Sequence, residues 1–122
     1  MFDAVSHAVI GAAIEVHREL GPSLLESFYE RALVEEFRLR GIEFARQNEV
    51  PATYKGIDLG GNYRLDLIVG DTVVVEIKAV QNLLPVHRAQ LLTYMRISGC
   101  RIGLLLNFHA AIMKSGIVRM VR

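Results

Sequence analysis

The sequence predicts an α/β fold, in which a central mixed sheet is flanked by helices in the order helix, helix, strand, strand, strand, helix, strand. Three observations support this. Two amphipathic stretches open the chain, two runs rich in Val, Ile and Leu meet at Gly70-Asp71, and a third amphipathic stretch precedes a short apolar run. Because helices and strands bury their apolar faces against one another in layers, we expect the long helices to pack on one sheet.

Length and composition predict a single globular domain that spans residues 1–122. About half of the residues are hydrophobic, which is enough for one core, and the chain is too short for a second. No apolar run approaches the ~20 residues of a membrane span, and the N-terminus does not resemble a signal peptide. We therefore expect a cytoplasmic protein without a membrane partner. The single Cys100 fits a reducing compartment.

The first two elements are predicted to be helices. Apolar residues recur at helical spacing from Asp3 to Leu20, and Gly21-Pro22 ends this stretch. Ser23-Leu24-Leu25-Glu26 has the pattern of a capping box, so a second helix is expected from about Leu24 to Arg40, before Gly41. The buried stripe of this helix is predicted to contain Leu25, Phe28, Tyr29, Ala32, Leu33 and Phe37.

Glu26 has two interpretations. As the third residue of the capping box, its carboxylate would only accept a hydrogen bond from the N–H of Ser23. Alternatively, it could face the strands and add a carboxylate to a metal site there. The spacing alone leaves both interpretations open.

The strands follow from Glu43 onward. Residues Glu43 to Tyr54 predict a first strand in which Pro51 marks a bend or an edge position. Lys55 to Gly61 is predicted to be a turn-rich connection. The two runs within Tyr63–Val80 then predict a β-hairpin.

The hairpin register is selected by burial. A two-residue loop would place Leu65 opposite Glu76 and mix an acid into an apolar face. A three-residue loop, Gly70 to Thr72, instead gives one wholly apolar face, and a one-residue slip would turn every side chain to the other side. In this second register the apolar pairs are Val69–Val73, Leu67–Val75 and Leu65–Ile77.

The same register places Asp66 opposite Glu76. Side chains at facing positions lie roughly 5 Å apart at Cβ, so two carboxylates there repel each other unless a cation or a proton lies between them. Mg²⁺ prefers oxygen ligands and is typically held by one or two carboxylates together with water and phosphate. Lys78 follows Glu76 by two residues and points to the same side. The hairpin therefore predicts a divalent metal site.

The last part of the chain predicts a helix and a strand. Pro85 suits the first turn of a helix that ends at Gly99, and Ile102–Asn107 predicts a buried strand, with a short strand or tail at 116–121. His87, Gln90 and Tyr94 share one stripe of the helix. They form either a polar seam with a capping His or a row of functional side chains.

Charge is distributed unevenly along the chain. After Glu76 there are seven Lys and Arg residues and no acid, whereas the first 76 residues carry seven bases and thirteen acids. This asymmetry favours an anionic partner such as a phosphate backbone, with Arg88, Arg96 and Arg101 as the expected contacts. The alternative is that the acidic half neutralises the basic half within the fold.

Two motifs resemble those of a known nuclease superfamily. Asp66, followed by Glu76-Ile77-Lys78, resembles the motif of the PD-(D/E)XK superfamily. The segment from Gly21 to Tyr29, with Glu26 three residues before Tyr29, is similar to the signature of its GxxExxY branch, although Ser23 stands where that signature has its first Gly. The resemblance continues through VEIKAV and PVHRAQLLTYMRISGCRIGLLLNF. It implies a restriction-endonuclease-like fold.

The resemblance also implies a chemistry, the hydrolysis of phosphodiester bonds in DNA or RNA with Mg²⁺, for which Mn²⁺ can substitute. Asp66, Glu76, the carbonyl of Ile77 and Glu26 would hold the metal, and Lys78 would orient or activate water. Gln90-x-x-x-Tyr94 resembles the QxxxY element of exonuclease-like branches. The residues that this comparison assigns to substrate positioning are Gln90, Tyr94, Tyr29 and His87.

Two other functions fit the same residues. One is a catalytically inactive nucleic-acid-binding or assembly module, in which Asp66 and Lys78 would pair as ions. The other is a metal-dependent phosphoesterase that acts on small phosphates. A homodimer is also expected, because a chain of this size offers little surface to a duplex.

Overall fold

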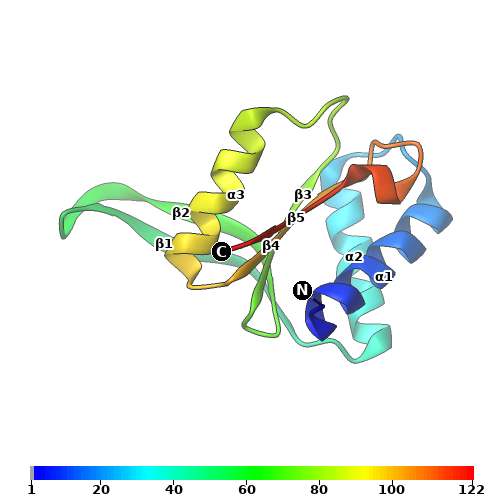
Figure 1. Cartoon of the computed structure of the whole chain (residues 1–122), viewed down its shortest axis with the longest axis horizontal. Helices are drawn as coiled ribbons and strands as arrows, with labels where there is room; N and C mark the ends of the chain where they lie inside the picture. Colours follow the sequence, from blue (N-terminus) through cyan, green and yellow to red (C-terminus); the bar gives the residue numbers. More distant parts are fainter. Residues whose placement is uncertain (1) are drawn as a thin grey trace.

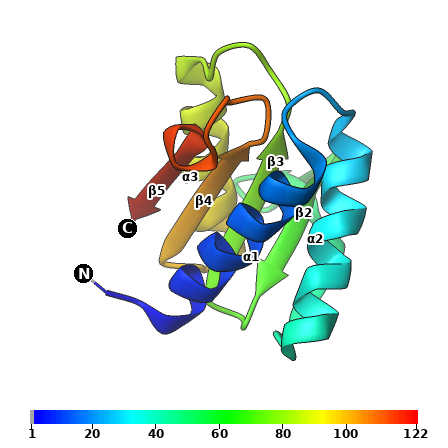
Figure 2. The same ribbon diagram turned by 90° about the vertical axis from the view of Figure 1, so that its right-hand side faces the viewer.

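The computed structural model describes residues 2–122 and has a five-stranded sheet between two layers of helices. Helices α1 and α2 cover one face and α3 covers the other (Figures 1 and 2). The elements are α1 (Ala4–Leu20), α2 (Glu26–Arg40), β1 (Phe44–Tyr54), β2 (Ile57–Val69), β3 (Val73–Lys78), α3 (Pro85–Ser98), β4 (Ile102–Asn107), the short 3₁₀-helix η1 (Met113–Gly116) and β5 (Ile117–Val121). The predicted fold class and element order are confirmed.

The sheet is mixed, with the strands in chain order from β1 to β5. β1, β2 and β3 are antiparallel neighbours, β3 and β4 are parallel, and β5 is antiparallel to β4. A parallel connection needs a crossover, and α3 provides it by returning the chain across one face of the sheet. The carboxyl end of β3 therefore faces the start of α3.

The start of α2 differs from the prediction. The helix begins at Glu26, Leu25 occupies the N-cap position, and no side chain caps it, so the predicted capping box at Ser23 is wrong. The reason lies in Tyr29, whose hydroxyl donates to the carbonyl of Gly21 and accepts from the N–H of Leu24. These two bonds hold the connection outside the helix.

The helical stripe of α2 is also narrower than predicted. Tyr29, Leu33 and Phe37 are fully buried, as expected, but Phe28 is 49% exposed and Leu25 is exposed as well. With the helix beginning at Glu26, these two side chains lie at the margin of its buried face. Phe28 therefore presents an aromatic ring to solvent.

The hairpin of β2 and β3 confirms the three-residue loop. Val69 pairs with Val73 and Leu67 with Val75, as the burial argument requires. Leu65 departs from the prediction, because it packs in the core on the α3 side, whereas Leu67 packs on the α1–α2 side. Since residues two apart normally share a face, the alternation of β2 is interrupted at Asp66.

The connection predicted at Lys55 to Gly61 is mostly strand. A turn at Lys55-Gly56 joins β1 directly to β2, and Tyr54 pairs with Ile57. Gly60 has a φ of +85°, a value that glycine can adopt within a strand. The strand β2 therefore continues through Gly60-Gly61. The two strands form an arm that projects from the body of the molecule (Figure 1).

The core has two parts, one on each face of the sheet. The larger part lies under α1 and α2, and the smaller part, which includes Leu65, Val74, Leu91 and Tyr94, lies under α3. Within residues 2–122, no helix combines the length and apolar character that crossing a membrane requires.

Candidate active site

The centre of the site is a pair of carboxylates, each of which accepts a hydrogen bond from a backbone N–H of the neighbouring strand. Glu76 Oε2 accepts the N–H of Asp66 at 2.9 Å, and Asp66 Oδ2 accepts the N–H of Ile77 at 2.9 Å. The regular pairing of β2 with β3 ends at Leu67 and Val75. The side chains of Asp66 and Glu76 therefore bind backbone N–H groups just beyond the end of this pairing. The two acids lie together, as the predicted register requires.

Burial makes this pair electrostatically unfavourable. Glu76 is 4% exposed. Its pKa is raised from the ordinary 4.5 to about 8, first because burial removes water from the carboxylate and then because Asp66 is negative. Burial also raises the pKa of Asp66, against the opposing effect of the Ile77 N–H. A cation at the pair would relieve both effects.

Lys78 lies close enough to influence both acids, since its positive charge lowers the pKa of each. It forms no ion pair with Asp66 in the part of the chain that the structure describes. Among the described residues, Lys78 therefore lacks the ion pair with Asp66 that we expect of an inactive module. The Ile77 side chain is buried, and only its backbone faces the pair.

The helix α2 brings further acids to this end of the sheet. Glu26 Oε2 accepts the N–H of Ala79, just after β3, at 3.3 Å, and the charge of Glu26 raises the pKa of Asp66. Glu26 thus faces the strands, as its second interpretation required, and does not cap the helix backbone. Glu30, one turn further along, was not singled out in the sequence.

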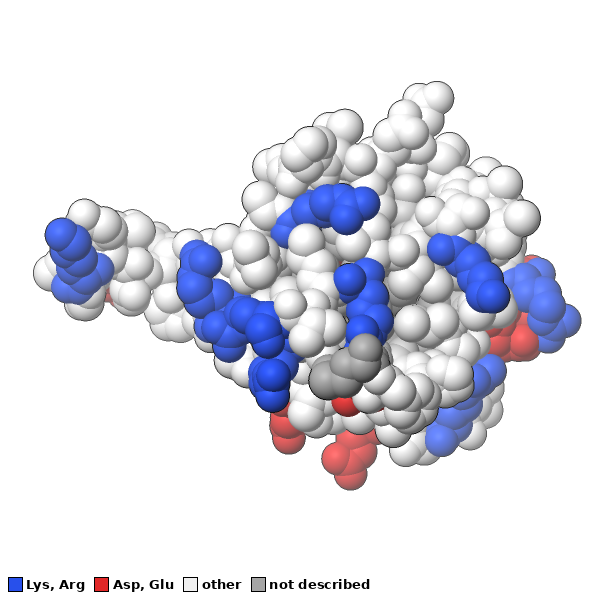
Figure 3. All heavy atoms as spheres, viewed as in Figure 1, with Lys and Arg blue, Asp and Glu red and all other residues white. Residues whose placement is uncertain are grey.

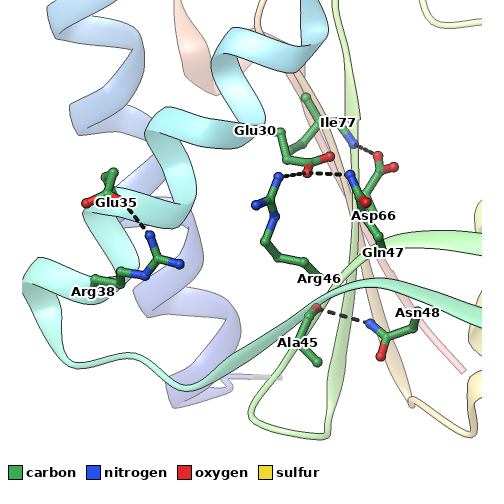
Figure 4. Close-up of polar contacts among 9 residues, drawn as sticks. All are labelled: Glu30, Glu35, Arg38, Ala45, Arg46, Gln47, Asn48, Asp66 and Ile77. Carbon is green, nitrogen blue, oxygen red and sulfur yellow. Dashed lines mark hydrogen bonds and ion pairs between the residues drawn. The ribbon is translucent and has the colours of Figure 1, made fainter.

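Glu30 reaches from α2 toward Arg46 and Gln47 of β1 (Figure 4). Its carboxylate accepts from Arg46 Nη2 at 2.8 Å and from Gln47 Nε2 at 3.4 Å, and its charge raises the pKa of both Asp66 and Glu76. Gln47 has a φ of +49°, an uncommon value for a residue with a side chain. The sequence did contain a signal that could have identified Glu30. This residue lies four residues after Glu26, which places both acids on one face of the helix.

The donor set suits a hydrated divalent cation. Within residues 2–122, no group of three His, Cys, Asp or Glu side chains is arranged to hold a metal ion. A buried and a half-buried carboxylate, both with raised pKa values, nevertheless suit a divalent cation that keeps several waters and completes its shell with substrate oxygens. The residues present therefore fit such an ion.

Comparison with known proteins agrees with this geometry. A family model described as the PD-(D/E)XK nuclease superfamily matches residues 3–120, which is nearly the whole chain. The chain belongs to the PD-(D/E)XK nuclease superfamily. No curated protein and no solved structure gives a significant match. Nucleases of the superfamily generally use divalent metals.

In this PD-(D/E)XK chain, α3 supplies a tyrosine to the surroundings of the acids. Tyr94 is 8% exposed, and its pKa is raised first by burial and then by the negative charges of Glu76 and Asp66, while a hydrogen bond with Gln90 lowers it. The Gln90–Tyr94 spacing thus brings one side chain near the acids and leaves its partner exposed. His87 lies nearer the helix start, where its Nδ1 accepts the N–H of Leu84 at 2.9 Å.

Tyr29 lies in the core beneath the connection between α1 and α2. Its ring is fully buried and stacks on Phe108 with a centroid distance of 4.5 Å, and its hydroxyl binds that connection. A role of Tyr29 in substrate positioning stays a prediction. Tyr29 stabilises the loop that precedes Glu26.

The three predicted nucleic-acid contacts are all exposed. Arg88 and Arg96 lie on α3, and Arg101 precedes β4 at the opposite end of the sheet from Lys78. Figure 3 shows Lys and Arg side chains spread across the face that carries α3 and β5, with acidic side chains at its margin. The excess of bases after Glu76 therefore becomes a basic face of the superfamily fold.

Proposed function

We propose that this protein is a Mg²⁺-dependent nuclease that hydrolyses phosphodiester bonds in DNA or RNA, with Mn²⁺ as an effective substitute. The observation that carries the proposal is the side-by-side placement of buried Glu76 and half-buried Asp66, with Lys78 nearby and in no ion pair within residues 2–122. Placing two acids side by side with one of them buried is costly for a fold, and a structural network would be expected to pair Lys78 with one of them. A site that receives a cation and a phosphate accounts for both features.

The roles of the residues follow from their positions. Asp66 and Glu76 would hold the metal, with the Ile77 carbonyl and Glu26 as further ligands. When bound, the metal lowers the pKa of a coordinated water and stabilises charge on the phosphate oxygens. Lys78 would place a positive charge near the attacking water and the phosphate.

The helix α3 closes the other side of the site. Tyr94 has a phenolic O–H that is protonated at neutral pH and can donate a hydrogen bond, and burial and Glu76 raise its pKa further. Gln90 accompanies it at the solvent side, where we place the substrate backbone. His87 orders the start of this helix through its bond to Leu84.

We also propose that the chain belongs to the GxxExxY branch of the superfamily. Support comes from Glu26, which contacts the N–H of Ala79 across 53 residues and so faces the end of β3. A Glu26→Gln variant should then weaken Mn²⁺ binding less than Asp66→Asn, because Glu26 lies at the edge of the pair. If Glu26→Gln leaves metal affinity and cleavage unchanged, Glu26 has only a structural role.

The first test is Mn²⁺ binding by calorimetry, which requires no choice of substrate. Wild-type protein should bind Mn²⁺, and Asp66→Asn and Glu76→Gln should each abolish binding. Cleavage is then measured with single- and double-stranded DNA and RNA in Mg²⁺ and in EDTA. Lys78→Ala should retain metal binding and lose at least about a hundredfold in kcat.

The outcome separates the competing functions. Cleavage of a small phosphodiester without any binding of long DNA or RNA would indicate a phosphoesterase. Nucleic-acid binding without metal binding or turnover would indicate an inactive module. Either result would contradict the nuclease proposal.

A further inference from the structure

We infer that the hollow between α2 and the first part of β1 binds single-stranded nucleic acid and leads it to the carboxylate pair; this inference rests on the proposed nuclease function. The hollow has a volume of about 580 Å³ and lies on the face opposite α3. It is therefore separate from the basic face formed by α3. Its walls include Phe28, Arg31, Glu35, Arg38 and Arg46.

Three arginines make the hollow suitable for phosphate. Arg31 and Arg38 lie on one stripe of α2, and Arg46 comes from β1. Arg31 forms no ion pair among the described residues, and Arg38 pairs with Glu35 where both side chains are more than half exposed. Because an exposed ion pair contributes little, a phosphate can replace Glu35 at little cost.

An exposed aromatic ring adds a surface for a base. Phe28 lies one helical turn before Arg31, is half exposed and lines the same hollow. Single-strand-binding sites combine a cationic groove with aromatic rings on which bases stack. In a duplex the bases are already stacked on one another, so this combination favours a single strand.

Arg46 lines the hollow and also contacts Glu30, at the end of the hollow nearer the carboxylate pair. Figure 4 shows Arg46 reaching from β1 toward Glu30, with Asp66 beyond it, and Arg38 further down α2. Arg46 donates to Glu30 at 2.8 Å, and Gln47, the next residue on β1, donates to the same carboxylate at 3.4 Å. A strand held by Arg31 and Arg38 therefore passes Arg46 before it reaches the pair.

The inference is tested by binding of a fluorescent single-stranded oligonucleotide, measured by anisotropy in EDTA so that no cleavage occurs. Arg31→Glu and Arg38→Glu should each weaken binding by about tenfold and lower the salt slope by about 0.7. Phe28→Ala should weaken binding about tenfold with an unchanged slope. The matched control is Arg18→Glu, because Arg18 pairs with Glu15 on α1 in the same i, i+3 arrangement as Arg38 with Glu35.

Each outcome is decisive. Unchanged affinity in Arg31→Glu, Arg38→Glu or Phe28→Ala, or equal weakening by Arg18→Glu, would overturn the inference, as would a wild-type protein that does not bind single strands. Thermal unfolding checks that every variant is folded. Tight binding that depends on the hollow but occurs without cleavage in Mg²⁺ would refute the nuclease proposal alone, whereas cleavage with hollow-independent binding would refute the inference alone.

Discussion

Glu76 is the residue at which the demands of the site oppose those of folding. An unfolded chain releases the Glu76 proton near pH 4.5, whereas the folded protein keeps it until about pH 8. Below pH 4.5 both states are protonated and the residue causes no pH dependence. Between these values the free energy of unfolding should fall by about 1.4 kcal/mol per pH unit, because the unfolded state binds fewer protons.

This effect predicts that Glu76→Gln is more stable than the wild type at pH 8 in EDTA, and that the difference shrinks as the pH falls to 4.5. The amide oxygen of Gln can still accept the N–H of Asp66, so the geometry is retained. Urea unfolding at pH 5 and pH 8 measures the difference. Added Mn²⁺ should stabilise only the wild type, and a variant without any gain at pH 8 would contradict the assigned burial of a charge.

At the same scale, the sequence predicted the pairing of Asp66 with Glu76 but not its surroundings. The register followed from which side chains must be buried, and burial is readable from residue types. The interruption of β2 at Asp66, which moves Leu65 to the α3 side, depends on the distorted backbone of Gln47 on the neighbouring strand. Such a distortion arises from tertiary contacts, here the bond of Gln47 to Glu30, and leaves no local pattern.

Among the elements, the connection between α1 and α2 depends on Tyr29. Removing its hydroxyl with Tyr29→Phe leaves the partly buried carbonyl of Gly21 and the N–H of Leu24 without this partner. We expect a loss of about 1–2 kcal/mol in unfolding free energy and little change in cleavage rate below the transition. Tyr54→Phe is the control, since Tyr54 is exposed on the arm. A large fall in kcat without a fall in stability would show that Tyr29 acts in substrate positioning.

The helix α3 is positioned by its close approach to β4 at Gly103. A Cβ atom there would lie 2.6 Å from Sδ of Met95 and 3.0 Å from Cδ1 of Leu91, both of which are fully buried. Gly103→Ala should therefore cost about 1–3 kcal/mol and, by displacing Tyr94 with its helix, lower kcat more than it raises KM. Gly61→Ala is the control, because no atom lies within 4 Å of its Cβ position. If Gly103→Ala left the free energy of unfolding unchanged, α3 could move away from β4 without destabilising the fold.

Element boundaries were predictable where a glycine or proline ends a helix and less so elsewhere. Gly21, Gly41 and Gly99 follow α1, α2 and α3 as expected. The capping box at Ser23 failed because Tyr29, a residue inside the helix, binds the segment before it. The capping-box pattern at Ser23 and the glycine pair in the arm of β1 and β2 are both short local signals. In each case, contacts between residues further apart in the chain determined the structure instead.

In the whole molecule, two cationic surfaces lie on opposite sides of the sheet. The basic face of α3 carries Arg88 and Arg96, whereas the hollow under α2 carries Arg31 and Arg46. The charge asymmetry along the sequence identified the first surface. It missed the second, because the arginines of α2 and β1 belong to a half of the chain with an excess of acids, and Arg46 indeed pairs with Glu30 in the fold.

The last prediction concerns the basic face of α3. A triple variant in which Arg88, Arg96 and Arg101 are replaced by Gln should weaken binding to duplex DNA at low salt and reduce the salt slope by about 2.7, if each side chain contacts one phosphate. The double variant Arg18→Gln/Arg40→Gln is the control, because these arginines are already paired with Glu15 and Glu36. Anisotropy titrations between 50 and 200 mM salt, roughly the range in which phosphate contacts lose most of their strength, measure both quantities. An unchanged slope in the triple variant would mean that the acidic half of the chain neutralises this face, and that nucleic acid approaches the carboxylate pair from the side of α2 alone.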